Sequence, residues 1–277
     1  MNIYDQLLKL QVIPSAWEEW TAYRHEITAY IIAHCENKKE VTILGAGRCN
    51  DIDLKLLLNH FDQVILVDMD LEAMQTGLMN QGLQNEHRIR LEVADFVGIS
   101  PDDYRHFANT LVCKVREKGL ATSMEELTQV ALEALERLEA QVMGSSLQLD
   151  LYVNTVVIGV HSQLISMLDW IWQSILQTLG QEEQSVRQKI MTMNTSVVKR
   201  FNEALMSSTQ CRMIIGYEIE RAGRAGAVQG AVQGAIDFKQ RVAKQEVALL
   251  GFTQMDWPFA KSQGILYHMG IFTLERV

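Results

Sequence analysis

The sequence has few of the residues that mark secreted, metal-binding or membrane-spanning proteins. Its four cysteines, at positions 35, 49, 113 and 211, form no CxxC pair and show no zinc-ligand spacing, so we expect free thiols and no metal. No run approaches the ~20 consecutive apolar residues of a membrane span. The N-terminal stretch MNIYDQLLKLQ carries an acid and no long apolar run, unlike a signal peptide. These absences predict a cytoplasmic protein that does not bind membranes.

Basic residues are also scarce relative to acidic ones. The chain has 25 Lys and Arg against 34 Asp and Glu, a formal net charge of −9. Tight nonspecific binding to nucleic acid needs clustered basic side chains, so we expect no nucleic-acid partner. With 277 residues, 48% of them hydrophobic, the chain is long enough for one large domain with an elaborated cap.

The first hundred residues alternate between strand and helix patterns. Short apolar strands are expected at 41–44 and 64–67, and a strand of alternating polar and apolar residues at 88–93, with helices at 51–60 and 71–83 between them. Continuous apolar strands separated by helices are typical of a parallel sheet that is covered on both faces. This half of the chain therefore predicts a β-α-β-α-β arrangement.

The rest of the chain predicts a helical interruption and then further strands. Ser15 and Glu18 have capping-box spacing at the start of a helix over 15–36. Further expected elements are a helix at 123–143, a strand at 147–157, helices at 163–179 and 183–206, a strand at 212–218, a glycine-rich loop at 223–237, a helix at 236–249, and strands from 251 and over 264–277. The predicted fold is α/β: a seven-stranded, mostly parallel, doubly wound sheet with one antiparallel strand. An N-terminal helical cap (1–40) would precede a Rossmann-like domain (41–277) with a helical insert (101–146).

Small and acidic residues follow the first three expected strands. Gly45 and Gly47 end the first strand, Asp68 ends the second and Asp95 follows the third. In a doubly wound sheet, ligands bind outside the carboxyl ends of the strands. Asp68 can accept both hydroxyls of a ribose, and Asp95 can accept from an exocyclic amine, with the N–H of Phe96 free for a ring nitrogen. Together these residues predict an adenosine site.

The residues after the glycines indicate which adenosine derivative is bound. A dinucleotide motif would place a third glycine at Asn50, and Asp51 follows it where a helix is expected to begin. An acid at a helix start disfavours a pyrophosphate and suits a ligand with an ammonium group. S-adenosylmethionine is such a ligand.

These segments resemble the class I S-adenosylmethionine-dependent methyltransferases. The similar motifs are ILGAGRCND (43–51), VILVDMD (64–70) and VADF (93–96), and the strand ending LDLYVNT (149–155) has the position of the family's fourth strand. The layout of the last two strands is also similar. The resemblance implies methyl transfer from S-adenosylmethionine, with S-adenosylhomocysteine as product, to oxygen or nitrogen of a small-molecule or peptide acceptor.

The resemblance also implies roles for individual residues. Gly45, Ala46 and Gly47 would line the methionine part of the cofactor, with Asn50 beside them, and Asp68 would bind the ribose. Met69 would cover one adenine face, although a core position is equally compatible with its sequence. Asp95 and Phe96 would meet the adenine edge, although Asp95 also suits a simple turn.

The sequence gives fewer indications of the residues that would bind the methyl acceptor. Asn154 and Thr155 would close the fourth strand and face the methyl donor, and His161 can take a proton from an attacking atom. A structural histidine with satisfied hydrogen bonds is the simpler interpretation of His161. The resemblance also implies that Arg24, with Tyr23, would cap the cofactor carboxylate, although a solvated helix face also explains Arg24.

Two other classes of function remain open. One is an NAD-dependent oxidoreductase, which would use the same ribose acid. The other is a non-catalytic nucleoside-binding relative of the methyltransferases. The acceptor and the oligomeric state are not indicated by the sequence, and a homodimer is one option.

Overall fold

A computed structural model describes residues 2–118, 123–223 and 229–277. The chain forms two compact units. A sheet unit comprises residues 14–94, 148–162 and 201–277, and a helical unit comprises residues 1–13, 95–147 and 163–200. The expected N-terminal cap is thus divided at residue 13, between the two units.

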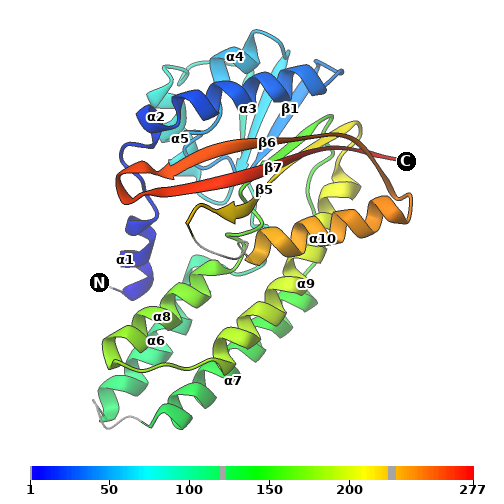
Figure 1. Ribbon diagram of the computed structural model, residues 1–277. Coiled ribbons are helices and arrows are strands. Elements are labelled where there is room, and N and C mark those ends of the chain that lie inside the picture. The colour runs from blue at the N-terminus through cyan, green and yellow to red at the C-terminus, as the bar shows by residue number, and fades with distance from the viewer. Residues whose placement is uncertain (1, 119–122, 224–228) are drawn as a thin grey trace. The chain divides into compact units, whose positions relative to one another are not determined.

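Seven strands form a single sheet in the order β3-β2-β1-β4-β5-β7-β6 (Figure 1). The strands are β1 (Glu40–Leu44), β2 (Gln63–Asp68), β3 (Ile89–Val93), β4 (Thr155–Ile158), β5 (Arg212–Arg221), β6 (Val247–Ala260) and β7 (Ile265–Arg276). The first five pair in parallel, and β7 pairs antiparallel with both β5 and β6. The predicted mostly parallel sheet with one antiparallel strand is confirmed, and β7 lies inside the sheet rather than at its edge.

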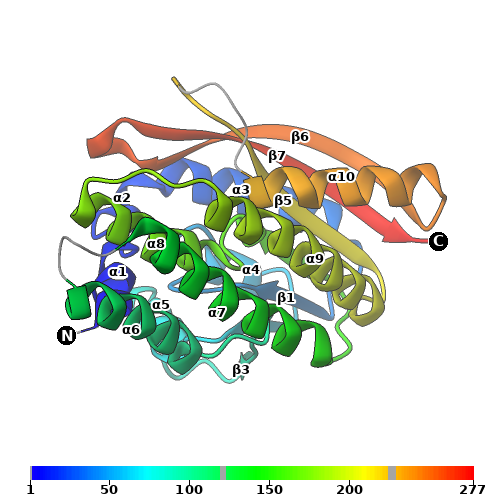
Figure 2. The same cartoon turned by 90° about the horizontal axis from the view of Figure 1, so that it is seen from below.

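Helices of the sheet unit cover both faces of this sheet. They are α2 (Ala16–Glu19), α3 (Thr21–His34), α4 (Leu54–Leu58), α5 (Leu71–Asn80) and α10 (Gln229–Ala243). Both α3 and α10 pack on β6, and they lie on opposite faces of the sheet (Figure 1, Figure 2). The strands between them carry fully buried branched side chains, as the apolar runs in the sequence predict.

Three expected boundaries in the sheet unit are wrong. The helix predicted over 15–36 breaks at Trp20 into α2 and α3, and Ser15 makes no side-chain cap. The strand predicted over 147–157 starts only at Thr155. The helix predicted from 236 starts at Gln229, so most of the expected glycine-rich loop is helical, and residues 224–228 lie outside the described part of the chain.

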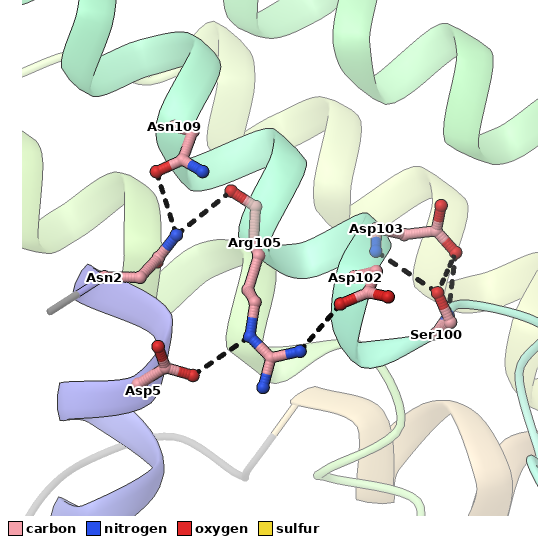
Figure 3. Close-up of polar contacts among 7 residues, drawn as sticks. All are labelled: Asn2, Asp5, Ser100, Asp102, Asp103, Arg105 and Asn109. Atoms are coloured by element: carbon pink, nitrogen blue, oxygen red, sulfur yellow. Dashed lines mark hydrogen bonds and ion pairs between the residues drawn. The ribbon is translucent and has the colours of Figure 1, made fainter.

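The helical unit contains α1 (Ile3–Leu10), α6 (Pro101–Lys118), α7 (Met124–Gly144), α8 (Ser166–Leu179) and α9 (Ser185–Ser208), the last as far as residue 200. The predicted insert therefore consists of α6 and α7, and α1 packs on both α6 and α8. Asn2 donates to the carbonyl of Arg105 and to the side chain of Asn109, and Arg105 binds Asp5 and Asp102 (Figure 3). Within the described residues, every helix is too short or too polar to span a membrane.

Candidate nucleoside-binding site

The turn after β1 brings two glycines close to β2 and β4. Gly45 and Gly47 have positive φ angles of 73° and 47°, which glycine adopts without steric cost. The N–H groups of Gly45 and Ala46 donate to the carbonyl of Val67 at 2.8 and 3.1 Å. A Cβ at Gly45 would clash with Cγ2 of Val160, whereas no described atom lies within 4 Å of a Cβ at Gly47. Gly45 therefore serves close packing, and Gly47 borders open space.

Asp68 stands at the end of β2 with its carboxylate held beside this turn. Oδ2 accepts from the N–H of Gly47 at 2.9 Å, and Oδ1 accepts from the N–H of Asp70 at 2.9 Å. Asp70 is the N-cap of α5 and accepts from Ala73. The helix-capping role therefore belongs to Asp70, and the Asp68 carboxylate can still accept further hydrogen bonds. Burial raises the pKa of Asp68, and the N–H groups of Asp70, Gly47 and Met69 oppose that shift.

Met69 follows Asp68 and is 42% exposed. A core position is therefore wrong for Met69, and its role at an adenine face stays a prediction. A large apolar side chain exposed beside a buried carboxylate is compatible with a ligand that has a polar and an aromatic part.

Asp95 and Phe96 follow β3 and belong to the helical unit. Oδ1 of Asp95 accepts from the N–H groups of Val97 and Gly98, at 2.8 and 2.9 Å. This is the turn geometry that the simpler reading of Asp95 predicts. Phe96 is half-buried. Contacts of both residues with adenine stay predictions.

The segment after the glycines is a turn rather than the start of a helix. The expectation that Asp51 begins a helix is wrong, because α4 starts at Leu54 with Asp53 as its N-cap, accepting from Leu56 at 2.9 Å. The acid at the helix start is thus Asp53. Burial raises the pKa of Asp51 to about 6, and nearby Arg24 opposes the shift.

Arg24 links α3 to this turn. Its guanidinium donates to the carbonyls of Asn50 and Trp17, both at 2.8 Å, and lies 3.6 Å from the centroid of the Trp17 ring. Only 6% of Arg24 is exposed, so the solvated-face interpretation is wrong. Asn50 contributes its carbonyl to this contact. Binding of a cofactor carboxylate by Arg24 stays a prediction.

Asn154 and Thr155 lie at the opposite end of β4 from the one expected. Thr155 pairs with Thr42 near the start of β1, so the strand begins where it was predicted to end. Asn154 donates to the carbonyls of Asn37 and Glu40, at 2.8 and 2.7 Å. The expectation that these two residues face the methyl donor is therefore wrong. The carboxyl end of β4 is Ile158, followed by residues 159–162.

His161 lies in that segment but is fully buried. Its Nε2 pairs with Oδ1 of Asn202 at 2.8 Å, and Asn202 in turn donates to Asp237. Burial lowers the pKa of His161 to about 4, so the ring is neutral near pH 7. Nδ1 of His161 is buried and has no hydrogen-bond partner among the described residues, so the ring is only half satisfied. Its role as a proton acceptor stays a prediction.

Glu218, near this end of the sheet, is a further candidate that was not predicted from the sequence. Glu218 is on β5, is 4% exposed, and accepts from the hydroxyl of Ser162 at 2.7 Å. An acid inside the apolar strand RMIIGYE is a signal that the sequence carries, because buried carboxylates are rare.

Comparisons with known proteins give matches in structure only. No family model matches the sequence, and no curated protein matches it. The N-methyltransferase NodS from Bradyrhizobium japonicum, in complex with S-adenosyl-L-homocysteine, superposes with a TM-score of 0.52 at 11% identity, over 100% of this chain and 99% of NodS.

Two further structures match with lower scores. Magnesium protoporphyrin IX methyltransferase (ChlM) from Synechocystis has a TM-score of 0.49 at 9% identity, over 99% of this chain and 94% of ChlM. A Pyrococcus horikoshii protein described as a candidate RNA methyltransferase has a TM-score of 0.40 at 10% identity, over 90% of this chain and 79% of the Pyrococcus chain. The strand order and the likeness to NodS together show that this chain has the seven-stranded Rossmann-like fold of the class I methyltransferases.

Proposed function

We propose that the protein is an S-adenosylmethionine-dependent methyltransferase. The observation that carries this proposal is the carboxylate of Asp68, held at the end of β2 by the N–H groups of Gly47 and Asp70. The carboxylate can still accept further hydrogen bonds, which suits the hydroxyls of a ribose. The open space at Gly47 lets a ligand approach the backbone there.

The described residues fit this cofactor better than a dinucleotide. A pyrophosphate is usually bound at a helix N-terminus directly after the glycine turn. Here the helix starts at Leu54, seven residues after Gly47, and Asp53 already occupies its N-terminus. Asp51 adds an acid that favours the ammonium group of S-adenosylmethionine. When bound, the cofactor supplies a methyl group on a positively charged sulfur.

The proposed roles of the protein residues are binding and orientation. Asp68 would bind the ribose, Met69 the adenine face, and Gly45, Ala46 and Gly47 the methionine part. Methyl transfer can proceed by proximity and in-line orientation, so it does not depend on His161 as a base. We propose a small-molecule or peptide acceptor, methylated on oxygen or nitrogen, because the net charge of −9 disfavours nucleic acid.

Thermal denaturation with added ligands tests the cofactor. S-adenosylhomocysteine should raise the melting temperature, and NAD should leave it unchanged, because ligands that bind only the folded state stabilise it. A rise with NAD but not with S-adenosylhomocysteine would instead support the oxidoreductase alternative.

The non-catalytic alternative needs a second measurement. Radiolabelled S-adenosylmethionine is incubated with the protein and a small-molecule and peptide extract, and labelled products are separated by chromatography. Label in a product that needs the protein supports transfer. Cofactor binding without any labelled product supports a non-catalytic nucleoside-binding protein.

A further inference from the structure

Three buried polar atoms at one end of the sheet unit have no hydrogen-bond partner. They are the hydroxyl of Tyr23, Oε2 of Glu218 and Nε1 of Trp257, and none has a partner among the described residues. Tyr23 is 2% exposed, and the other two residues are each 4% exposed. Buried polar groups are nearly always paired, so three such atoms point to a missing partner.

The three side chains are neighbours. A Cβ placed on Gly159 would lie 3.1 Å from the Trp257 ring and 3.3 Å from Oε1 of Glu218. The Tyr23 ring stacks on Trp257 with the ring centroids 5.6 Å apart. The residues come from α3, β5 and β6, so three separate elements bring these unpaired atoms to one place.

This cluster adjoins the glycine turn. Val160, next to Gly159, is the residue that a Cβ at Gly45 would strike. Asp51 and Glu218 both raise the pKa of Tyr23, after burial as the main cause. The contacts of Gly159 and Val160 place the cluster at the carboxyl end of β4, beside the turn at which the proposed methyl donor would bind.

The two acceptors of the cluster, Glu218 and the Tyr23 hydroxyl, suit a small cation, whereas the Trp257 N–H is a donor. Oε2 of Glu218 has no partner among the described residues, although a buried carboxylate is costly without a positive partner. Trp20 and Phe259 also contact the Trp257 ring, with centroids 5.0 Å away in each case. Aromatic faces attract ammonium groups, and more strongly when water is excluded.

We propose that Glu218 and Tyr23 bind the amino group of the methyl acceptor beside the Trp257 ring, so that the substrate is a primary or secondary amine. Oε2 of Glu218 is placed to accept the ammonium proton, and the Tyr23 hydroxyl can accept a second one. Burial raises the pKa of Glu218, which favours proton transfer to it from a bound ammonium. The assignment of this amine as a methyl acceptor rests on the proposed methyltransferase function.

The test uses methylammonium chloride as the probe and the full-length protein saturated with S-adenosylhomocysteine. The readout is the indole N–H signal of Trp257 in a nitrogen-15 correlation spectrum, assigned among the five tryptophans by Trp257→Phe. Methylammonium should shift this signal in a saturable way. Ethanol, a neutral molecule of similar size, and sodium chloride at equal ionic strength should not.

Two variants separate the contributions of the cluster. Glu218→Gln keeps the shape of the side chain and should weaken methylammonium binding by at least about tenfold. Tyr23→Phe keeps the ring stack and should weaken it less. If methylammonium does not shift the Trp257 signal of the wild type, the unpaired atoms bind only water and the proposal is overturned. Equal binding of methylammonium by the wild type and Glu218→Gln also overturns it.

A second arm distinguishes the acceptor from the cofactor as the source of the amino group. Binding of S-adenosylhomocysteine is compared with that of methylthioadenosine, which lacks the amino acid part. If Glu218→Gln weakens binding of S-adenosylhomocysteine but not of methylthioadenosine, Glu218 binds the amino acid part of the cofactor and the acceptor assignment is overturned. If wild-type protein binds methylammonium but not S-adenosylhomocysteine, the ammonium site stands and the methyltransferase function fails.

Discussion

The two units of the chain differ in how their polar side chains are grouped. In the helical unit, Ser100 and Asp103 cap α6 reciprocally, and Arg105 is shared between Asp5 and Asp102 (Figure 3). Nε1 of Trp172 in the helical unit lacks a described partner, whereas in the sheet unit such atoms of Tyr23, Glu218 and Trp257 belong to neighbouring side chains. Satisfied polar groups stabilise a fold, whereas unsatisfied ones are commonly retained where a ligand binds. Because several unpaired atoms lie together in the cluster of Tyr23, Glu218 and Trp257, we expect ligand binding in the sheet unit.

The glycine turn shows a second contrast, between two residues within the sheet unit. Gly45 has a positive φ and no room for a side chain, and Gly47 has a positive φ with open space beside it. The two glycines therefore separate a packing role from a binding role. The predictions below test this division and the contrast between the units, starting with the largest effect.

Gly45→Ala should cause the largest loss of stability. The new methyl group would clash with Val160, and alanine is strained at a φ of 73°. The expected loss in free energy of unfolding is about 2–5 kcal/mol, measured by urea denaturation. Gly47→Ala is the matched control and should cost about 1–2 kcal/mol, from the φ angle alone. Equal losses in the two variants would contradict the packing role of Gly45.

Asp51→Asn should stabilise the protein near neutral pH. The pKa of Asp51 is about 6 in the folded state and 3.8 as the ordinary value, so the folded state holds the proton more tightly. The contribution of this proton to the free energy of unfolding is fully present below about pH 3.8 and is lost as the pH rises through 6. The variant should gain up to about 3 kcal/mol at pH 7, and the gain should shrink as the pH falls from 6 to 4.

The measurement is urea denaturation of both proteins across this pH range. Asp62→Asn, at an exposed aspartate, is the matched control. A gain that does not depend on pH would show that burial of charge at Asp51 is not the cause. Binding of S-adenosylhomocysteine should weaken in the Asp51 variant, because the acid that favours its ammonium group is lost.

Asp68→Ala should weaken binding of S-adenosylhomocysteine by about 1–3 kcal/mol, from the loss of charge-assisted hydrogen bonds to the ribose. Isothermal titration calorimetry measures this change. Asp70→Ala is the matched control: it removes the N-cap of α5, costs about 1 kcal/mol of stability and leaves binding unchanged. The ribose assignment is wrong if the Asp68 variant binds like the wild type.

Arg105→Ala should have the smallest effect. Its ion pairs with Asp5 and Asp102 are exposed, and exposed pairs add little to stability and are screened by salt. The melting temperature should fall slightly at low salt and match the wild type at high salt, with binding of S-adenosylhomocysteine unchanged. A clear loss of binding would contradict the assignment of ligand binding to the sheet unit.

The sequence predicts the parallel half of the fold well, because that half follows from local patterns. The strands ending at Leu44 and Asp68 are continuous apolar runs, and the glycines and acids after them occur at the expected strand ends. The run LQLDLYVNTVV was less informative. Its alternation suggests one long strand, but only its last residues pair with β1, so Asn154 and Thr155 were placed at the wrong end.

The candidate amine site could not be predicted from local patterns. Tyr23, Glu218 and Trp257 are far apart in the sequence, and each looks like an ordinary core or surface residue in its own segment. Only the packing of α3, β5 and β6 brings them together, and only burial reveals that their polar atoms lack partners. Tertiary contacts of this kind have no signature within a single helix or strand.

The position of β7 between β5 and β6 has a consequence for folding during synthesis. Residues 265–276 form an inner strand, with Met269, Ile271 and Leu274 buried, so the sheet cannot be completed before the ribosome has released them. Until then, the edge of β5 presents unpaired N–H and carbonyl groups to any other extended chain. The β6–β7 hairpin thus closes the sheet last, and the time the nascent chain takes to supply it sets how long this edge is exposed to aggregation.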